Sequence, residues 1–544
     1  MAIRDNLGSG GGSSRVENGI KQTTAATLAN SAKGGVKIVD IFGACKQAAD
    51  PTANDPQYIG HTRFKNMLQI TVPTKENNGI TANEISDSYG NTSGIKISGT
   101  ATALTAISIG TITAQKGSYI LSGCPSGGSV SSYWLNVATK GNDTGAGVTL
   151  EYGEEETNEV FIYVAEGATV DAMFYPMFRS ALAANGDFVP YGAMPIKTKG
   201  AQLVNIGEPR TYTTNGITFI VETDESITIN GTATATAILQ VPARYSAGKE
   251  LTISAEANIA SSCILRFAAP DYSVVTESQM TVNATSKSHT FTLTEETAFF
   301  DVRFGKGETA NNVNIKFMVN EGNVTLPRRL YAENTSYLPD PVELYGIGSV
   351  ADSMNFDGIT RRFAKVVFDG SEDELWTAQP TKDTAEDGKY RYTTRFLHGL
   401  AKGFNIADSA NLMCTHYKAV PSNSTGTWGK NEGISIDAAG TLLVYDKNIN
   451  TSDISLWKAH LAENPIEVVY ELADPITEEI SAANKKALCN LPSYDGVTYI
   501  ECDAEITPIL EVEYGTSRAG ALTLENSNEI ALNRLAIQEM GGTV

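Results

Sequence analysis

The side chains with the best spacing for metal chemistry are Cys414 and His416, which one residue separates. On a strand this spacing puts both on one face, where a thiolate and an imidazole could bind zinc. No second pair at finger-like spacing accompanies them, so we predict neither a metal site nor another cofactor. The sequence also lacks the GxSxG, HExxH, P-loop and strand–GxGxxG–helix motifs. We therefore expect the protein to catalyse no reaction.

Carboxylates are abundant, as in the runs Glu154–Glu156 and Glu372–Glu374. Glycoside hydrolysis needs two carboxyl groups about 5–10 Å apart in a cleft, whereas acidic runs are commonly solvated turns. We interpret these two runs as solvated. The segment Asp352–Gly358 resembles a calcium loop but lacks the EF-hand spacing and its closing glutamate. A structural calcium ion there is an alternative that the sequence leaves open.

Exposed aromatic side chains give a better indication of binding, because sugars stack on aromatic faces while amides and carboxylates fix their hydroxyl groups. In the predicted strand Tyr133–Val137, alternation turns Trp134 and Asn136 away from the apolar side. Trp428 lies in a polar loop, and Trp376 follows an acidic turn. We predict glycan contacts at Trp134, Asn136, Trp428 and Trp376. The alternative is that each tryptophan packs against a neighbouring domain.

The elements that must position these residues are mostly strands. From about residue 66, apolar and small polar residues alternate, and Gly or Pro separates the runs. The strands recur at roughly 8–12-residue spacing, which is typical of a β-sandwich or jelly roll. The same pattern then returns: Asn230–Ala235 repeats Ser98–Ala103, and Phe174–Phe178 has a later counterpart in Ile315–Val319. We predict two copies of one sandwich module, in preference to a chance bias toward Thr, Ala and Gly.

The remaining segments have a different character. Residues 22–33 are rich in Ala and Thr, and we expect a short helix there, in an arm that orders against a partner chain. One helix is predicted after Thr451 or Ser452 as cap, with Ile454, Trp457 and Leu461 on its apolar face. The fold class is therefore mainly β. The predicted parts are an N-terminal arm (1–65), β-sandwich module 1 (66–195), module 2 (203–341), a β-rich domain with one helix (342–515) and a docking tail (516–544) in which 529–540 form an amphipathic helix.

Composition narrows the possible partners. Lys plus Arg is 41 and Asp plus Glu is 62, which gives a net charge of −21. Such a surface repels nucleic acid and an anionic membrane, so we expect neither as a partner. The first residues lack an apolar signal region, and we expect synthesis in a cytoplasm. The six cysteines form no CxxC pair, and we predict that they are buried free thiols. A disulfide bridge between Cys489 and Cys502 is an alternative that the sequence leaves open.

Several phrases of the sequence resemble tail-tip, baseplate and fibre proteins of phages and prophages of Gram-positive hosts. The opening Met1–Gly8 is similar to the start of such proteins, and Tyr119–Gly128 with the Gly-Thr-Ala-Thr-Ala repeats resembles their jelly-roll, carbohydrate-binding-like modules. The third domain resembles their C-terminal part in Val342–Val350, Arg361–Arg362, Asp369–Asp373, Leu456–Pro465 and Val469–Pro475. The resemblance covers about 1–15 and most of 66–515, and residues 516–544 lie outside it.

The resemblance implies a virion protein of the tail, assembled in the host cytoplasm, that forms a trimer or other symmetric oligomer and contacts other virion proteins. Its leading implication is host attachment through surface glycans. The alternatives are a purely structural baseplate or head-decoration subunit, and a cell-wall hydrolase on the tail. The second module lacks the Cys-Pro-Ser-Gly-Gly turn at 124–128 of the first. A ligand site that used this turn would therefore exist only in module 1.

Overall fold

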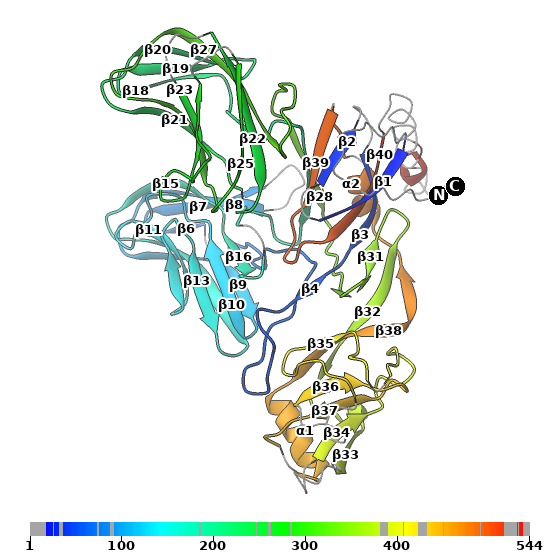
Figure 1. The fold of residues 1–544 in the computed structure, drawn as a ribbon. Coiled ribbons are helices and arrows are strands. Elements are labelled where there is room, and N and C mark those ends of the chain that lie inside the picture. The colour runs from blue at the N-terminus through cyan, green and yellow to red at the C-terminus, as the bar shows by residue number, and fades with distance from the viewer. Residues whose placement is uncertain are drawn as a thin grey trace.

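A computed structural model of the chain describes residues 18–24, 27–31, 36–72, 75–86, 92–183, 186–245, 247–258, 263–282, 286–380, 390–405, 407–422, 432–449, 451–489, 491–494, 496–515, 530 and 533–536. Antiparallel sheets make up nearly all regular structure in these ranges. Figure 1 shows the two modules on one side of the molecule, a central group of strands beside them, and a group that contains α1 at the far end. The predicted fold class, mainly β with tandem sandwiches, is confirmed.

Module 1 packs its sheets over one core of alternating inward side chains, among them Ile97, Ile107, Leu121, Leu135 and Ile162. One layer has the strand order β12 (Gly141–Asp143), β11 (Tyr133–Val137), β14 (Glu156–Val164), β9 (Thr105–Ala114). The other layer comprises β15 (Thr169–Phe174), β8 (Thr92–Thr100), β7 (Ile80–Ser86), β6 (Glu76–Asn77) and, as a second sheet, β13 (Val148–Tyr152), β10 (Gly117–Ser122), β16 (Met177–Ser180).

Module 2 has the same arrangement. Its larger sheet has the order β18 (Arg210–Thr214), β19 (Ile217–Val221), β20 (Ile227–Thr232), β27 (Thr309–Glu321), β22 (Glu250–Ala257), β25 (Ser286–Thr292). Its smaller sheet has the order β21 (Ala237–Pro242), β26 (Phe299–Phe304), β23 (Cys263–Ala268), β24 (Met280–Val282). Strand by strand, the two orders correspond, with β15 and β16 together in the place of β27. Pro176 lies between β15 and β16 and has no N–H for the ladder, which accounts for the split.

The glycine of the repeated Gly-Thr-Ala-Thr-Ala segment is needed for the same structural reason in both modules. Gly99 and Gly231 adopt φ of +127° and +114°, in the left-handed half of backbone space. A Cβ on Gly99 would lie 2.1 Å from the carbonyl oxygen of Gly79, and a Cβ on Gly231 would lie 2.1 Å from that of Gly216. Both contacted glycines follow an asparagine in the hairpin turn before the repeat. The glycine is therefore required by close approach of the turn.

We predict that Gly99→Ala and Gly231→Ala each destabilise their own module. Each variant adds a side chain to a strained backbone, which costs about 1–3 kcal/mol, and drives its Cβ into a carbonyl. Urea denaturation of each full-length variant should show this loss. Gly153→Ala is the control, because no atom lies within 4 Å of its Cβ and its backbone is not left-handed. Equal stability of Gly99→Ala and Gly153→Ala would contradict the explanation.

The central sheets join segments that are far apart in sequence. The seven-stranded sheet has the order β1 (Asn18–Thr24), β40 (Ile509–Gly515), β3 (Val36–Phe42), β31 (Ser353–Met354), β32 (Ile359–Phe368), β38 (Ile466–Glu478), β35 (Leu412–Cys414). The four-stranded sheet has the order β2 (Thr27–Ser31), β39 (Gly496–Cys502), β17 (Met194–Lys199), β28 (Glu333–Leu338). Two short pairs complete this region: β4 (Cys45–Lys46) with β5 (Gly60–His61), and β29 (Gly346–Ile347) with β30 (Val350–Ala351).

Two predictions for the N-terminal arm are wrong. The helix expected over residues 22–33 is replaced by strands β1 and β2 where the chain is described. These strands pair with β40 and β39 of the same chain, so this part of the arm orders without a partner chain. Pairing with strands nearly 500 residues away overrides the local helix preference of Ala.

The far end of the molecule contains a sheet of β33 (Trp376–Pro380), β34 (Tyr390–Thr394), β37 (Leu442–Tyr445), β36 (Gly433–Ile436) and helix α1 (Ile454–Glu463). The predicted α1 is confirmed, with Trp457 and Leu461 fully buried, but its N-cap is Asp453, which accepts from the Ser455 N–H. A 3₁₀ turn, η1 (Glu372–Glu374), and a second helix, α2 (Ala482–Cys489), were not predicted. In the predicted tail, residues 530 and 533–536 are helical, and the others lie outside the described residues.

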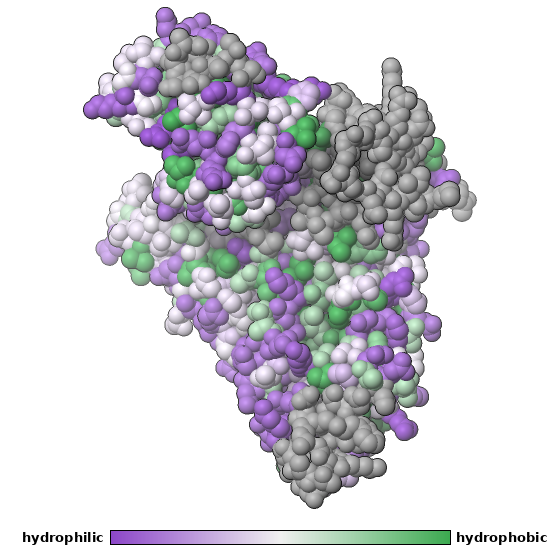
Figure 2. Space-filling model, in the orientation of Figure 1, coloured by the Kyte–Doolittle hydropathy of each residue, from purple (hydrophilic) through white to green (hydrophobic). Residues whose placement is uncertain are grey.

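All six cysteines are free thiols, so the bridge between Cys489 and Cys502 that the sequence left open is not present. None of the helices in the described ranges is long and apolar enough to span a membrane. On the face drawn in Figure 2, hydrophobic residues occur in small groups among hydrophilic ones. A binding surface must therefore be identified from particular side chains.

Candidate functional site

The outer face of the β12-β11-β14-β9 sheet carries three aromatic side chains. Along β11, Leu135 and Val137 are fully buried, so Trp134 points outward, as predicted. The same alternation along β14 turns Phe161 and Tyr163 outward, and each is half-buried. We call Trp134, Phe161 and Tyr163 the aromatic strip.

The strip is held together by register and by ring stacking. Trp134 pairs directly with Tyr163 across β11 and β14. Their ring centroids are 5.1 Å apart with planes 7° from parallel, the offset stack that aromatic pairs prefer. Phe161 lies two residues along β14, with its centroid 5.8 Å from that of Tyr163. Leu104, which directly precedes β9, is 58% exposed.

Polar groups lie beside the strip on the same face. Asn136 pairs with Phe161 across the strands, and its Nδ2 donates to Asn142 Oδ1 at 2.8 Å. Glu159 lies on β14 one outward position beyond Phe161 and accepts a hydrogen bond from the Ser108 hydroxyl. The face therefore combines stacked rings with amide and carboxylate groups, a combination suited to hydrogen-bonding a ligand rich in hydroxyl groups.

Module 2 fills the equivalent face differently. Leu265 pairs with Val302 in β23 and β26 as Leu135 pairs with Ile162 in module 1. By this register Ile264, Arg266, Asp301 and Arg303 take the places of Trp134, Asn136, Phe161 and Tyr163. The Arg266 Nε donates to Asp301 Oδ2 at 2.9 Å, and Gln240 Nε2 donates to Asp301 Oδ1 at 2.8 Å. These four positions therefore offer no aromatic ring to a ligand.

The four predicted contact residues do not lie together. Trp134 and Asn136 share the outer face of module 1, whereas Trp428 lies outside the described residues. The prediction for Trp376 is wrong: it is 4% exposed and packs edge-on against Phe368 and Trp457 in the core of the far end. The residues that the sequence reasoning missed are Phe161 and Tyr163. Their alternation within Val160–Val164 was the available signal.

The acidic turn before Trp376 is buried in part, contrary to its interpretation as solvated. Glu374 is 3% exposed and accepts from the backbone N–H of Asp369 at 2.7 Å and from Trp376 Nε1 at 2.5 Å. Burial raises the pKa of Glu374, and these hydrogen bonds oppose that shift. Glu374 thus holds the tryptophan in the core, which explains why an acidic neighbour did not indicate exposure.

In the calcium-like loop, the side-chain oxygens of Asp352 and Asn355 accept hydrogen bonds from backbone donors. Asp352 is fully buried and accepts N–H groups from Tyr345, Arg362 and Phe363 at 2.7–3.0 Å. Asn355 Oδ1 accepts from the N–H groups of the two residues that end the loop. Across the described ranges, no group of three or more metal-ligating side chains comes together. The geometry explains this loop as a turn that its own side chains stabilise.

Cys414 and His416 are held by protein contacts. Burial raises the pKa of the Cys414 thiol to about 12, so its thiolate is strongly disfavoured. The Cys414 sulfur accepts from the His416 backbone N–H at 3.5 Å, and His416 Nδ1 lies 2.9 Å from Thr415 Oγ1. Burial, with smaller contributions from His460 and Lys116, lowers the pKa of His416 to about 4.

We predict that His416 makes the stability of this region depend on pH. Between pH 6.5 and about 4 the unfolded chain protonates this imidazole while the folded chain keeps it neutral, so stability present above pH 6.5 is lost as pH falls. The loss is about 2 kcal/mol, given the size of the shift and the partial exposure of the ring. Urea denaturation at pH 7 and pH 4.5 should show a smaller difference for His416→Gln than for the parent chain. Identical pH slopes would contradict this assignment.

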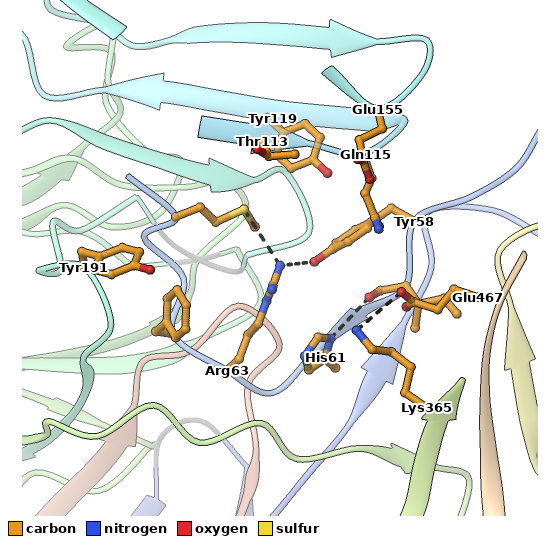
Figure 3. A pocket seen from close by; sticks show the side chains of 13 residues that line it. Tyr58, His61, Arg63, Thr113, Gln115, Tyr119, Glu155, Tyr191, Lys365 and Glu467 are labelled. Atoms are coloured by element: carbon orange, nitrogen blue, oxygen red, sulfur yellow. Dashed lines mark hydrogen bonds and ion pairs between the residues drawn. The ribbon is translucent and has the colours of Figure 1, made fainter. Parts of the chain in front are cut away.

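A cleft of about 250 Å³ lies where module 1 meets the central strands (Figure 3). Apart from Glu155, its charged side chains are matched in pairs. Arg63 Nε donates to Glu505 Oε2 at 2.7 Å, and Arg63 also donates to the Tyr58 hydroxyl. Lys365 Nζ lies 3.5 Å from Glu467 Oε2. His61 Nε2 lies 3.5 Å from Glu343 Oε2, although without hydrogen-bond geometry.

These pairs form an ionic seam along one extended segment. His61, Arg63 and Lys65 alternate, and each lies opposite a carboxylate of a distant segment: Glu343, Glu505 and Asp503. Interaction with His61 is the main reason that the pKa of the Glu343 carboxyl is lowered to about 2. These ion pairs join segment 61–65, which leads directly into module 1, to residue 343 and residues 503–505. We therefore interpret the seam as a junction that fixes the entry of module 1 to the central region.

Comparisons with known proteins add little. No protein-family model matches the sequence, and no curated protein matches it. Two solved structures have weak similarity: infectious bursal disease virus Gx strain, with 7% identity over 96% of this chain and 88% of that chain and a TM-score of 0.13, and the Gt strain, with 9% identity over 98% and 93% and a TM-score of 0.10. Scores this low carry no argument about fold or function.

Proposed function

We propose that this chain is a non-catalytic component of a phage or prophage tail that binds host-surface carbohydrate through the aromatic strip of module 1. The observation that carries the proposal is the outward stack of Trp134 on Tyr163, with Phe161 beside it. Rings that serve only as core face inward, whereas these lie on the outer face of a sheet whose inner face is already filled. The tail setting rests on the sequence resemblance described above.

The chemistry of the strip favours an uncharged sugar. The C–H face of a pyranose can pack on an aromatic ring, and Asn136 and Asn142 can exchange hydrogen bonds with its hydroxyl groups. Glu159 would accept from a hydroxyl but repel an acidic sugar. The net charge of −21 argues against nucleic acid and anionic lipid as partners. In this proposal the chain assembles with its own copies, as a trimer, and with other virion proteins in the host cytoplasm.

The proposal is tested by binding of the full chain to purified host cell-wall polysaccharide and to an array of neutral glycans. We expect binding that a soluble sugar competes and that periodate oxidation of the polysaccharide removes. Absence of binding, or binding that resists oxidation, would favour the purely structural role. The same incubation should release no reducing ends, because we propose no hydrolytic activity; their release would contradict that part of the proposal.

A further inference from the structure

The outer face of the β12-β11-β14-β9 sheet continues well beyond the aromatic strip. Along β14, Glu159 and Thr157 occupy the next two outward positions after Tyr163 and Phe161. At the rise of a β-strand, the distance along β14 from Tyr163 to Thr157 is about 20 Å. Thr113 pairs with Thr157 at the end of this face and also lines the cleft shown in Figure 3.

Hydroxyl groups line the part of this face that lies beyond the rings. Strand β9 turns Ser108, Thr111 and Thr113 outward, and the neighbouring β14 contributes Thr157. A register shift in this pairing places two buried residues between Ser108 and Thr111, which keeps both on the outer face. The outward residues of the four strands are all exposed or half-buried, so the whole length of the face is open to a ligand.

The pair of threonines at the end of the face has hydrogen-bonding capacity left for a ligand. The Oγ1 atoms of Thr113 and Thr157 are 2.9 Å apart, so one hydroxyl group donates to the other. This contact uses one of their two donors, and each oxygen has two acceptor lone pairs. A sugar hydroxyl group, which both donates and accepts, can bond to this pair.

Threonine is common in strands for structural reasons, and module 2 shows whether the sandwich needs hydroxyl groups at these positions. Strands β21 and β26 correspond to β9 and β14 in strand order. Both strands lie within the described ranges, and none of their outward residues has a hydroxyl group: Ile238, Gln240, Pro242, Phe299, Asp301 and Arg303. The same sheet therefore forms without them, so the hydroxyl groups of module 1 need an explanation other than folding.

The charge of the face favours one kind of polymer. Among the outward residues of the four described strands of this sheet, Glu159 is the one charged side chain, and it accepts a hydrogen bond from Ser108. An acidic polysaccharide would be repelled there, and no cation of these strands would compensate. Rings, amides and hydroxyl groups together suit an uncharged polysaccharide.

We propose that an extended stretch of a linear, uncharged polysaccharide lies along β14, from the aromatic strip to the Thr113–Thr157 pair. Sugar rings pack on Trp134 and Phe161 at one end, and the hydroxyl groups of the following units bond to the threonines at the other. This inference rests on the proposed function. It adds that the chain recognises several consecutive sugar units and not a single sugar.

The test uses the cell-wall polysaccharide of the binding assay above, cut by partial acid hydrolysis and separated by chain length. Binding of each fraction to the full chain is measured by calorimetry or ligand-observed NMR. We expect affinity to rise at least tenfold from disaccharides to hexasaccharides, because longer fragments contact more of the face, and then to level off. Trp134→Ala should weaken the binding of fractions of every length.

The double variant Thr113→Val, Thr157→Val removes the hydroxyl groups at the end of the face and keeps residues that suit a strand. It should weaken the binding of hexasaccharides about fivefold, in line with the modest worth of neutral hydrogen bonds, and leave disaccharide binding within twofold. Thr213→Val, Thr218→Val is the matched control, because these residues form the same kind of exposed cross-strand pair in module 2, with Oγ1 atoms 3.1 Å apart. It should change hexasaccharide binding less than twofold.

The outcomes separate this inference from the proposed function. Equal affinity for all fragment lengths, or equal losses in the two double variants, would overturn the extended site while leaving carbohydrate binding at the aromatic strip intact. A loss of disaccharide binding as large as that of hexasaccharide binding in the Thr113, Thr157 variant would also overturn it. Absence of binding to the intact polysaccharide would overturn both proposals.

Discussion

Trp134→Ala is expected to weaken carbohydrate binding by about 30-fold, or about 2 kcal/mol, the loss typical of a central aromatic contact. The variant removes the outer ring of the Trp134–Tyr163 stack and leaves the inward face of β11 intact, where Leu135 and Val137 fill the core. Because Trp134 itself is only half-buried, the free energy of unfolding should change by less than about 1.5 kcal/mol. Binding to host wall polysaccharide and urea denaturation of the same sample measure both quantities.

Tyr272→Ala serves as the matched control for this result. Tyr272 is 62% exposed and stacks on Phe299 at 5.1 Å, so it is a comparable exposed ring stack in module 2. It should leave binding to the polysaccharide within twofold of the parent chain. Trp134→Phe should retain part of the affinity because a smaller ring remains. Equal losses in the two alanine variants would contradict the assignment of the site to module 1.

Lys65→Met is expected to destabilise the junction by about 3–5 kcal/mol, the cost of leaving a buried charge without its partner. Lys65 Nζ lies 2.6 Å from Asp503 Oδ2, and the two side chains are 0% and 7% exposed. Burial lowers the pKa of Lys65 and raises that of Asp503, so each ion depends on the other to stay charged. Urea denaturation should show the transition of the central sheets at lower urea.

Two further variants separate this effect from a general loss of charge. Lys418 Nζ also lies 2.6 Å from its partner, Asp50, but those side chains are 58% and 72% exposed. Lys418→Met should therefore cost less than about 1 kcal/mol. The double variant Lys65→Met, Asp503→Leu removes both buried charges and should recover most of the lost stability. A double variant as unstable as Lys65→Met would show that shape, and not the unpaired charge, dominates.

The sequence was most informative where the pattern is local. The offset between Gly99 and Gly231 reflects the same turn contact in both modules. The apolar spacing of Trp457 and Leu461 identified α1, since both lie on one face within two turns. Trp134 could be placed outward because alternation needs only its own strand.

The predictions that were wrong or incomplete concern residues whose structure depends on contacts with distant parts of the chain. Residues 22–24 and 27–31 are strands because β39 and β40 lie beside them, and no local signal reports this. Trp376 is buried because it packs against Trp457 of the distant helix α1, while its neighbour Glu374 satisfies the indole N–H inside that core. The strip needed the register of β11 against β14, which one strand cannot supply.

The distance between paired strands also has a consequence during synthesis. Ser31 at the end of β2 pairs with Gly496, which is 465 positions further along the chain. Ribosomes add roughly 5–20 residues per second, so β2 waits about 25–95 s for its neighbour. The two modules contain mostly local pairings and can fold as they emerge, whereas the central sheets remain open for that interval. Recovery of soluble protein should thus depend on chaperones that shield unpaired strand edges while translation proceeds.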